Sequence, residues 1–295
     1  MSEFKKYHPI VNFLYFVFVI VFSVTEMHPV CLTISLLSSL LCTFVCCGSD
    51  RLKNSVLFFI PVFIMTALIN PLFNHEGITI ITYLPGGNPL TLESVVYGLC
   101  SACMIVNVIC WFGVYGNIMT SDKFIYLFGR VIPSLSLILS MTLRFVPLFA
   151  KQLKTVVNAR KGMGIDSSTG SIKTRIKNGL TVLSVMITWA LENAIDTADS
   201  MRSRGYGIPG RTAFSVFRFS ERDIAAITAI VFLGLYVLVG SFAGAAEILY
   251  FPYLKSVPFS LYSVSVYFAY GILCLIPIFI EIWEVIKWNV SDWKK

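Results

Sequence analysis

The chain has 295 residues, of which 56% are hydrophobic and 13% are charged, and its mean hydropathy is +0.78. A water-soluble domain exposes more charge than this, so the composition predicts an all-α integral membrane protein with several spanning helices. The net charge of +7 does not indicate nucleic-acid binding, because membrane proteins usually carry basic cytoplasmic loops. We therefore expect the lipid bilayer as a partner and no nucleic acid.

The N-terminus carries Lys5 and Lys6 ahead of an apolar run over residues 10–24. A signal peptide begins in this way, but no small-x-small cleavage site follows and another apolar run begins near Pro29. We therefore expect a first spanning helix here. Apolar stretches of similar length recur, and they predict about six spans, over residues 9–24, 29–47, 54–72, 92–118, 223–242 and 261–286.

The loop between the third and fourth predicted spans is rich in proline and glycine and contains no lysine or arginine. Residues 78–83 alternate and are β-branched, which favours a short hairpin or an extended loop. Thr91, followed by Glu93, is typical of a helix start. Basic residues lie at the opposite ends of the two spans that this loop joins, and near both chain termini. The positive-inside rule therefore places this loop outside and both termini in the cytoplasm.

Residues 131–150 and 179–198 are also apolar, but basic residues flank both ends of each segment, which is unusual for a simple span. Polar residues recur every three or four positions along both segments, from Ser140 to Lys161 and from Thr181 to Ser203. This period predicts two long amphipathic helices on the cytoplasmic side, between spans four and five, with a kink at Pro147. The predicted regions are 1–130, 131–210 and 211–295.

The second amphipathic segment ends in Met201-Arg202-Ser203-Arg204-Gly205-Tyr206-Gly207. Arginine at a helix C-terminus complements the helix dipole, and glycine is the preferred residue beyond the C-cap. By itself this stretch indicates an ordinary helix end. The first segment ends in a related stretch, Asn158-Ala159-Arg160-Lys161-Gly162-Met163-Gly164.

Motifs for catalysis are missing from the sequence. There is no nucleotide-binding P-loop, no metalloprotease or hydrolase signature, and the three histidines lie far apart. Cys100 and Cys103 form a C-x-x-C, but no second pair accompanies them, and the eight cysteines lie in apolar runs where they act as small hydrophobic residues. We expect no catalytic residue, no metal and no cofactor.

The stretches above, in their order, resemble the transmembrane T component of energy-coupling factor (ECF) transporters, the EcfT or CbiQ-like family. Residues 84–93 resemble the family's outer loop, and residues 143–148 resemble its Arg-Phe-x-Pro stretch. Residues 158–164 and 201–207 fall on its first and second Ala-Arg-Gly motifs. The resemblance extends to about residue 242.

The resemblance implies a non-catalytic subunit of an ATP-driven importer in a prokaryotic cell membrane, with vitamins or metal ions as the transported class. Two cytosolic ATP-binding cassette ATPases would dock at the ends of the two amphipathic helices, and a membrane-embedded substrate-binding S component would pack on their apolar faces. The implied docking residues are Arg160, Lys161, Met163, Gly164, Arg202, Ser203, Arg204 and Gly205. Arg144, Pro147 and Gly207 would shape the coupling helices.

The sequence departs from the family at two points. Met163 stands where the first motif normally has arginine, and Arg160 or Lys161 would have to replace that charge. The chain also has two predicted spans after the second motif, where many relatives have one.

The sequence leaves two alternatives open. A transporter with its own midplane site would need ionisable residues in the spans, which are nearly absent from the first four. A membrane-embedded enzyme would have to use Glu192, Asp196 and Asp199, whose positions fit a solvated or ion-paired helix face better.

Overall fold

The computed structural model describes residues 3–83, 87–129, 132–165, 171–206, 208, 217–256 and 260–292. Helices dominate this part of the chain, which confirms the predicted all-α membrane class. The chain divides into two compact units. Unit 1 joins Met1–Phe124 to Phe217–Lys295, and unit 2 is Ile125–Val216.

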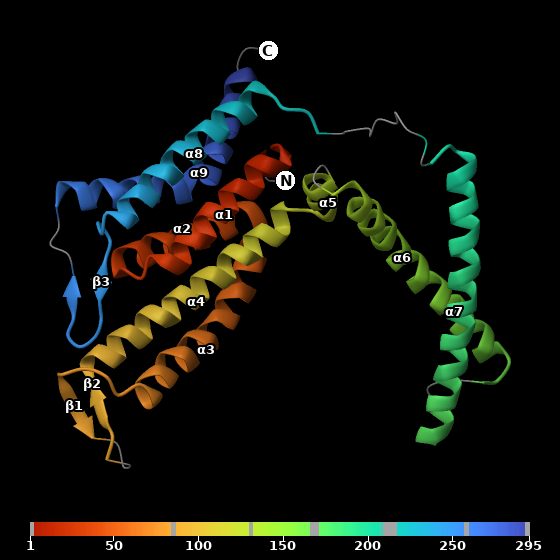
Figure 1. Cartoon of the computed structure of the whole chain (residues 1–295), viewed down its shortest axis with the longest axis horizontal. Helices are drawn as coiled ribbons and strands as arrows, with labels where there is room; N and C mark the ends of the chain where they lie inside the picture. The colour runs from red at the N-terminus through yellow and green to blue at the C-terminus, as the bar shows by residue number, and fades with distance from the viewer. Residues whose placement is uncertain are drawn as a thin grey trace. The chain divides into compact units, whose positions relative to one another are not determined.

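Unit 1 is a bundle of long apolar helices (Figure 1). Five of them, α2, α3, α4, α8 and α9, are long and apolar enough to cross a membrane. The first predicted span, α1, forms a shorter apolar helix of 17 residues. The bounds are α1 Pro9–Thr25, α2 Pro29–Cys47, α3 Ser49–Phe73, α4 Leu92–Ile118, α8 Glu221–Phe242 and α9 Leu261–Asp292, preceded by a 3₁₀ helix at Glu3–Lys6.

Two short antiparallel hairpins connect helices of unit 1. Of the two alternatives predicted near residues 78–83, the short hairpin is confirmed: β1, Ile80–Tyr83, pairs with β2, Pro89–Thr91. Thr91 then caps α4 by accepting the Ser94 amide at 3.3 Å, as its position in the sequence predicts. The second hairpin, β3 at Ile248–Leu249 and β4 at Lys255–Ser256, joins α8 to α9.

The core of unit 1 forms around α1, whose Tyr15 and Phe16 are almost fully buried beside Trp111 of α4. Tyr15 also donates to the carbonyl of Cys274 in α9 at 2.9 Å, so the first and last spans pack together. By contrast, α3 packs on α4 and buries only Phe59 and Pro71 among its side chains. Aromatic packing therefore fixes α1 at the centre of the bundle and α3 at its edge.

A buried lysine binds the N-terminal segment of unit 1. Lys123, at the start of α5 (Ser121–Gly129), is 4% exposed, and its ammonium group donates to the carbonyls of Lys5 and Tyr7. With the Asn12 amide oriented to satisfy both of its neighbours, its oxygen accepts a third bond from Lys123 at 2.6 Å. Burial lowers the pKa of Lys123 to about 8, so the amine stays charged at neutral pH and uses all three donors.

The same segment is bound from its other side by the start of α8. The Asp223 carboxylate accepts the His8 amide at 3.0 Å and forms a capping box with Ser220. His8 also stacks on Phe219, with ring centroids 3.8 Å apart. We call Lys123, Asp223 and the backbone of residues 5–8 the N-terminal clamp.

Unit 2 consists mainly of α6, Pro133–Gly162, and α7, Ile172–Ser203. These are the two predicted amphipathic helices, and each is longer than the apolar segment that indicated it. The helix α6 continues through Pro147. Figure 1 shows the two helices crossing, and Phe149 of α6 meets Trp189 of α7 edge-on at 5.5 Å.

Candidate functional site: the ends of α6 and α7

The C-terminal end of α6 closes in a hydrogen-bonded turn over residues 160–165. Met163 is the C-cap, and Gly164 has a φ of 77°, a left-handed conformation that favours glycine. The Gly164 amide donates to the Lys161 carbonyl and the Ile165 amide to the Arg160 carbonyl, both at 3.0 Å. This pair of bonds defines a Schellman motif, which satisfies the last helix carbonyls.

The end of α7 repeats the same turn over residues 201–206. Arg204 is the C-cap and Gly205 has a φ of 76°. The Gly205 amide donates to the Arg202 carbonyl and the Tyr206 amide to the Met201 carbonyl, both at 3.0 Å. The two helices of unit 2 therefore end with the same backbone geometry. We call the two ends the α6 turn and the α7 turn.

Aligning the two turns by their hydrogen bonds shows an exchange of side chains. Arg160 occupies the position that Met201 has in the α7 turn, and Met163 occupies that of Arg204. Residues three apart on a helix are neighbours on one face, so both turns present one arginine and one methionine in opposite order. The first motif, which lacks arginine at the C-cap, thus has an arginine one helical turn earlier.

The two arginines differ in their surroundings. Arg160 is partly buried and donates to the backbone carbonyl of Asn178 at 3.1 Å and to its side-chain oxygen at 3.4 Å, which ties the end of α6 to α7. Arg204 is exposed at the C-terminus of α7, where the partial negative charge of the helix dipole favours a cation. Met163 is 68% exposed. The accessible group at the C-cap is therefore apolar in the α6 turn and charged in the α7 turn.

The crossing of the helices places the two turns on opposite arms. Phe149 faces Trp189, and Arg160 contacts Asn178 further along, so α6 and α7 run antiparallel. Met163 lies 14 residues beyond Phe149 and Arg204 lies 15 residues beyond Trp189. At 1.5 Å per residue, the α6 turn and the α7 turn lie about 21 Å and about 23 Å along their own helices from the crossing. Such an arrangement can engage two similar partners.

The other residues that the sequence singled out lie near these turns or within the helices. Lys161, Arg202 and Ser203 are exposed, and the Ser203 hydroxyl donates to the Ser200 carbonyl at 2.9 Å. Arg144 and Pro147 are exposed on α6, remote from the turn. Gly207 lies outside the described residues. Sequence reasoning did not single out Asn178, nor did it recognise that Met201 occupies the position of Arg160. Aligning Gly164 with Gly205 in the sequence would have shown the equivalence of Met201 and Arg160.

Both helices of unit 2 leave large apolar side chains exposed. Within its described residues α7 buries only Val182, and α6 buries no described side chain. The exposed apolar residues recur at helical spacing along each helix: Ile138, Leu143, Val146, Leu153, Ile176, Leu180, Leu183, Ile187, Leu191 and Ile195. An apolar face of this extent marks an interaction surface or contact with lipid.

The acidic residues of α7 do not gather into a cleft. Glu192, Asp196 and Asp199 are exposed along the helix. Across the described ranges, no three His, Cys, Asp or Glu side chains are placed to hold a metal ion.

Comparison with known proteins identifies the family. The family model CbiQ, described as cobalt transport protein, matches residues 1–216. The chain belongs to the CbiQ family. Its membership confirms the resemblance predicted from the two motifs, and the helices of spanning length identify this CbiQ-family chain as a multi-pass membrane protein.

Curated relatives of this CbiQ-family chain are named energy-coupling factor transporter transmembrane protein EcfT. The relative from Exiguobacterium sibiricum is 34% identical over 105 residues, which are 35% of this chain and 40% of the relative. Those from Lactobacillus helveticus and Staphylococcus aureus are 32% identical over 108 residues and 30% over 119. These two matches cover 36% and 40% of this chain, and 39% and 44% of the relative. The chain thus spans about two fifths of the length of the curated relatives it matches.

Proposed function

We propose that this protein is the transmembrane energy-coupling subunit of an ECF-type importer. Two cytosolic ATP-binding cassette ATPases dock at the α6 and α7 turns, one at each. The observation that carries the proposal is the recurrence of one Schellman motif at both helix ends, with a φ of 77° at Gly164 and 76° at Gly205. Two equivalent backbone ends on opposite arms suit a pair of similar partners better than a single one.

The chemistry of the turns supports docking of an acidic partner surface. Arg204 is exposed and extends its planar guanidinium from a helix end, so a carboxylate of an ATPase can accept two parallel hydrogen bonds from it. Gly205 lets the chain leave the helix sharply, so that the arginine stands at the tip. In the α6 turn, exposed Met163 supplies a flexible apolar contact, with Lys161 beside it.

The exposed apolar faces of α6 and α7 support a second, membrane-embedded partner. We propose that a substrate-binding S component packs on these faces and that ATP-driven movement of the two helices reorients it. Packing that must form and break repeatedly requires contacts that are broad and non-directional, which aliphatic side chains such as Leu183 and Leu191 provide. In this arrangement the S component carries the substrate site, for a vitamin or a metal ion, and the present chain carries no catalytic group.

The proposed placement in the membrane follows from charge. Both chain termini, the loop after α6 and the segment after the α7 turn face the cytoplasm of a prokaryotic cell. A single cysteine introduced at residue 173 or 206, with exposed native thiols replaced, should react with a membrane-impermeant reagent only after the cells are opened. Reaction of residue 173 in intact cells would contradict the placement of unit 2 on the inner face.

Purification of the assembled complex tests the docking role. The tagged chain is co-expressed with its two ATPases and S component, and the ATPase recovered per chain is measured. We expect Arg204→Glu to abolish recovery of at least one ATPase while the chain still inserts in the membrane. Lys151→Glu is the matched control, because Lys151 is equally exposed but lies on α6 near its crossing with α7, away from both turns. Full ATPase recovery with Arg204→Glu would refute the docking role.

A further inference from the structure

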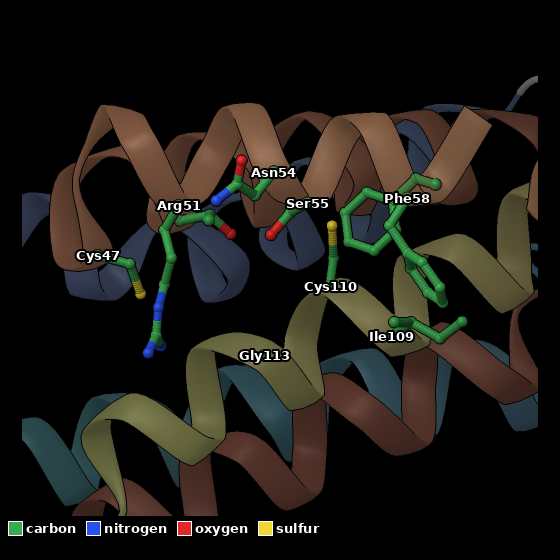
Figure 2. Close-up of a pocket in the computed structure, with 10 residues that line it drawn as sticks. Cys47, Arg51, Asn54, Ser55, Phe58, Ile109, Cys110 and Gly113 are labelled. Carbon is green, nitrogen blue, oxygen red and sulfur yellow. The ribbon is translucent and has the colours of Figure 1, made fainter. Parts of the chain in front are cut away.

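A pocket of about 330 Å³ lies where α2, α3 and α4 meet, beside the beginning of α3. Figure 2 shows Arg51 extending from α3 toward α4, with Gly113 of α4 on the opposite wall. The volume is at the lower end of the range for small-molecule sites. Nothing in the proposed coupling mechanism uses this pocket.

Polarity changes in one direction along the α3 wall of the pocket. Arg51 stands at the start, Asn54 and Ser55 follow one turn later, and Phe58 and Phe59 follow after a second turn. These spacings place all five residues on one face of the helix. The wall therefore passes from a cation through hydrogen-bonding groups to aromatic rings within about 11 Å. Ile109 of α4 adds to the apolar end.

The polar groups of this wall are not satisfied within the described part of the chain. Arg51, Asn54 and Ser55 make no side-chain hydrogen bond or ion pair to any residue that the structure describes. The described lining contains no carboxylate. One uncompensated positive charge with an amide and a hydroxyl beside it suits an anionic ligand that is rich in oxygen acceptors.

We propose that this pocket binds the phosphate of an anionic glycerophospholipid. Arg51 pairs with the phosphate, Asn54 and Ser55 donate to phosphate or glycerol oxygens, and an acyl chain lies on Phe58, Phe59 and Ile109. The charge and the polarity gradient both support a lipid, since a phospholipid also passes from anion to ester to hydrocarbon along its length. The wall belongs to a helix of spanning length that buries few side chains, so a lipid can enter sideways from the bilayer.

Two variants separate the contributions of charge and space. Arg51→Gln removes the cation from an exposed side chain, so the fold should be unaffected. Gly113→Leu fills the pocket, because a Cβ added at Gly113 meets no heavy atom within 4 Å. The matched control is Lys53→Gln, which removes an exposed cation two residues from Arg51 that does not line the pocket.

The experiment measures lipid retained by the purified full-length chain. The chain is reconstituted in vesicles of equal parts phosphatidylglycerol and phosphatidylcholine, extracted into detergent, and analysed by native mass spectrometry. The wild type should retain one phosphatidylglycerol in preference to phosphatidylcholine. Arg51→Gln and Gly113→Leu should each lower the occupancy about tenfold, equivalent to ~1.4 kcal/mol, and Lys53→Gln should not.

Three results would overturn the proposal. Equal retention by the wild type and both pocket variants would show that the lipid binds elsewhere. An equal loss with Lys53→Gln would show only a general attraction of basic residues for anionic lipid. Displacement of phosphatidylglycerol by excess inorganic phosphate, without detachment of other lipids, would show that the pocket recognises a free anion. Because the measurement needs no ATPase or S component, its failure would leave the proposed coupling function untouched.

Discussion

Unit 1 pairs several of its buried charges with backbone atoms of its own chain, whereas unit 2 leaves most of its described charges and much of its apolar surface exposed. Lys123 binds carbonyls of the N-terminal segment, Asp223 binds the His8 amide, and Glu93 accepts from the Thr79 backbone amide at 3.2 Å. In unit 2, Arg204 and Met163 face outward at the helix ends. Substitutions at polar groups of unit 1 should therefore change stability, and those at the turns of unit 2 should change association.

The apolar surfaces reinforce this contrast. Unit 1 has a core of large side chains in which Trp111, Tyr15 and Tyr270 are almost fully buried, while Val182 is the buried side chain among the described residues of α7. A pair of helices that buries this little of its own surface depends on other molecules for much of its stabilisation. This contrast supports the proposal that unit 2 makes the contacts with partners and that unit 1 supplies the stable frame. Four predictions test this division.

The largest effect is expected at the α7 turn. Arg204→Ala should weaken ATPase association by roughly 2–5 kcal/mol if a partner carboxylate is left buried without its cation, and it should leave the thermal unfolding of the chain unchanged. Met163→Ala is the matched variant of the α6 turn and should cost less, because it removes only apolar contact. High salt should weaken the Arg204 contact more than the Met163 contact, to the extent that ions reach it. Complex recovery at low and high salt provides the measurement.

A large loss of stability with no direct loss of docking is expected at the N-terminal clamp. Lys123→Met leaves the carbonyls of Lys5 and Tyr7 without their donor, and we expect it to lower the unfolding free energy by about 2 kcal/mol. Hydrogen exchange of the His8 amide should also accelerate, although that amide bonds to Asp223 and not to Lys123. Lys6→Met, at an exposed site nearby, is the control. An unchanged His8 amide would mean that the two sides of the clamp act independently.

A smaller and unequal effect is expected when alanine replaces the glycine of each turn. Alanine at a φ near 77° is strained, so Gly164→Ala and Gly205→Ala should each destabilise their turn by about 1 kcal/mol. Gly205→Ala should cost more, because its added Cβ would lie 3.0 Å from Cδ1 of Ile208, whereas the space beside Gly164 is open. Hydrogen exchange of the Tyr206 and Ile165 amides measures how often each turn opens, in the wild type and in the variant. Equal acceleration at both amides would contradict the difference in packing.

The smallest effect on docking is expected from Arg160. Because its guanidinium bonds to Asn178, Arg160→Ala should mainly loosen the α6–α7 hairpin, with less loss of ATPase than Arg204→Ala. Exchanging the pair, with Arg160→Met and Met163→Arg together, should give the α6 turn the salt dependence of the α7 turn. Equal losses for Arg160→Ala and Arg204→Ala would instead show that Arg160 replaces the missing arginine fully.

Much of the fold could be predicted because hydrophobic runs of spanning length leave a strong signal. The six predicted spans all form helices, and the hairpin before α4 and its cap at Thr91 follow from local sequence. The clamp could not be predicted, because it depends on contacts between residues more than 100 positions apart. In the sequence, Lys123 has the pattern of a solvated cytoplasmic base, and only the packing shows that it is buried.

The candidate site was predictable in part, because some of its features depend on local sequence and others on packing. Glycine after a basic helix end marks Gly205 clearly, and the same spacing marks Gly164 once the two ends are compared. The exchange of Arg160 and Met163 relative to Met201 and Arg204 becomes meaningful only when the backbone bonds align the two turns. Likewise, the contact of Arg160 with Asn178 depends on how α6 packs against α7, so the residues near Arg160 in the sequence do not predict it.

The N-terminal clamp also makes the chain modular. The segment that leaves unit 1 after Phe124 and the segment that re-enters it at Phe217 are fixed to adjacent backbone groups, at Tyr7 and His8. Residues 125–216 are thus an insertion whose flanking segments in unit 1 are held close together, a geometry in which proteins accept replacement of the inserted part. A foreign helical pair grafted between the same junctions should therefore leave the membrane core that carries it unaltered.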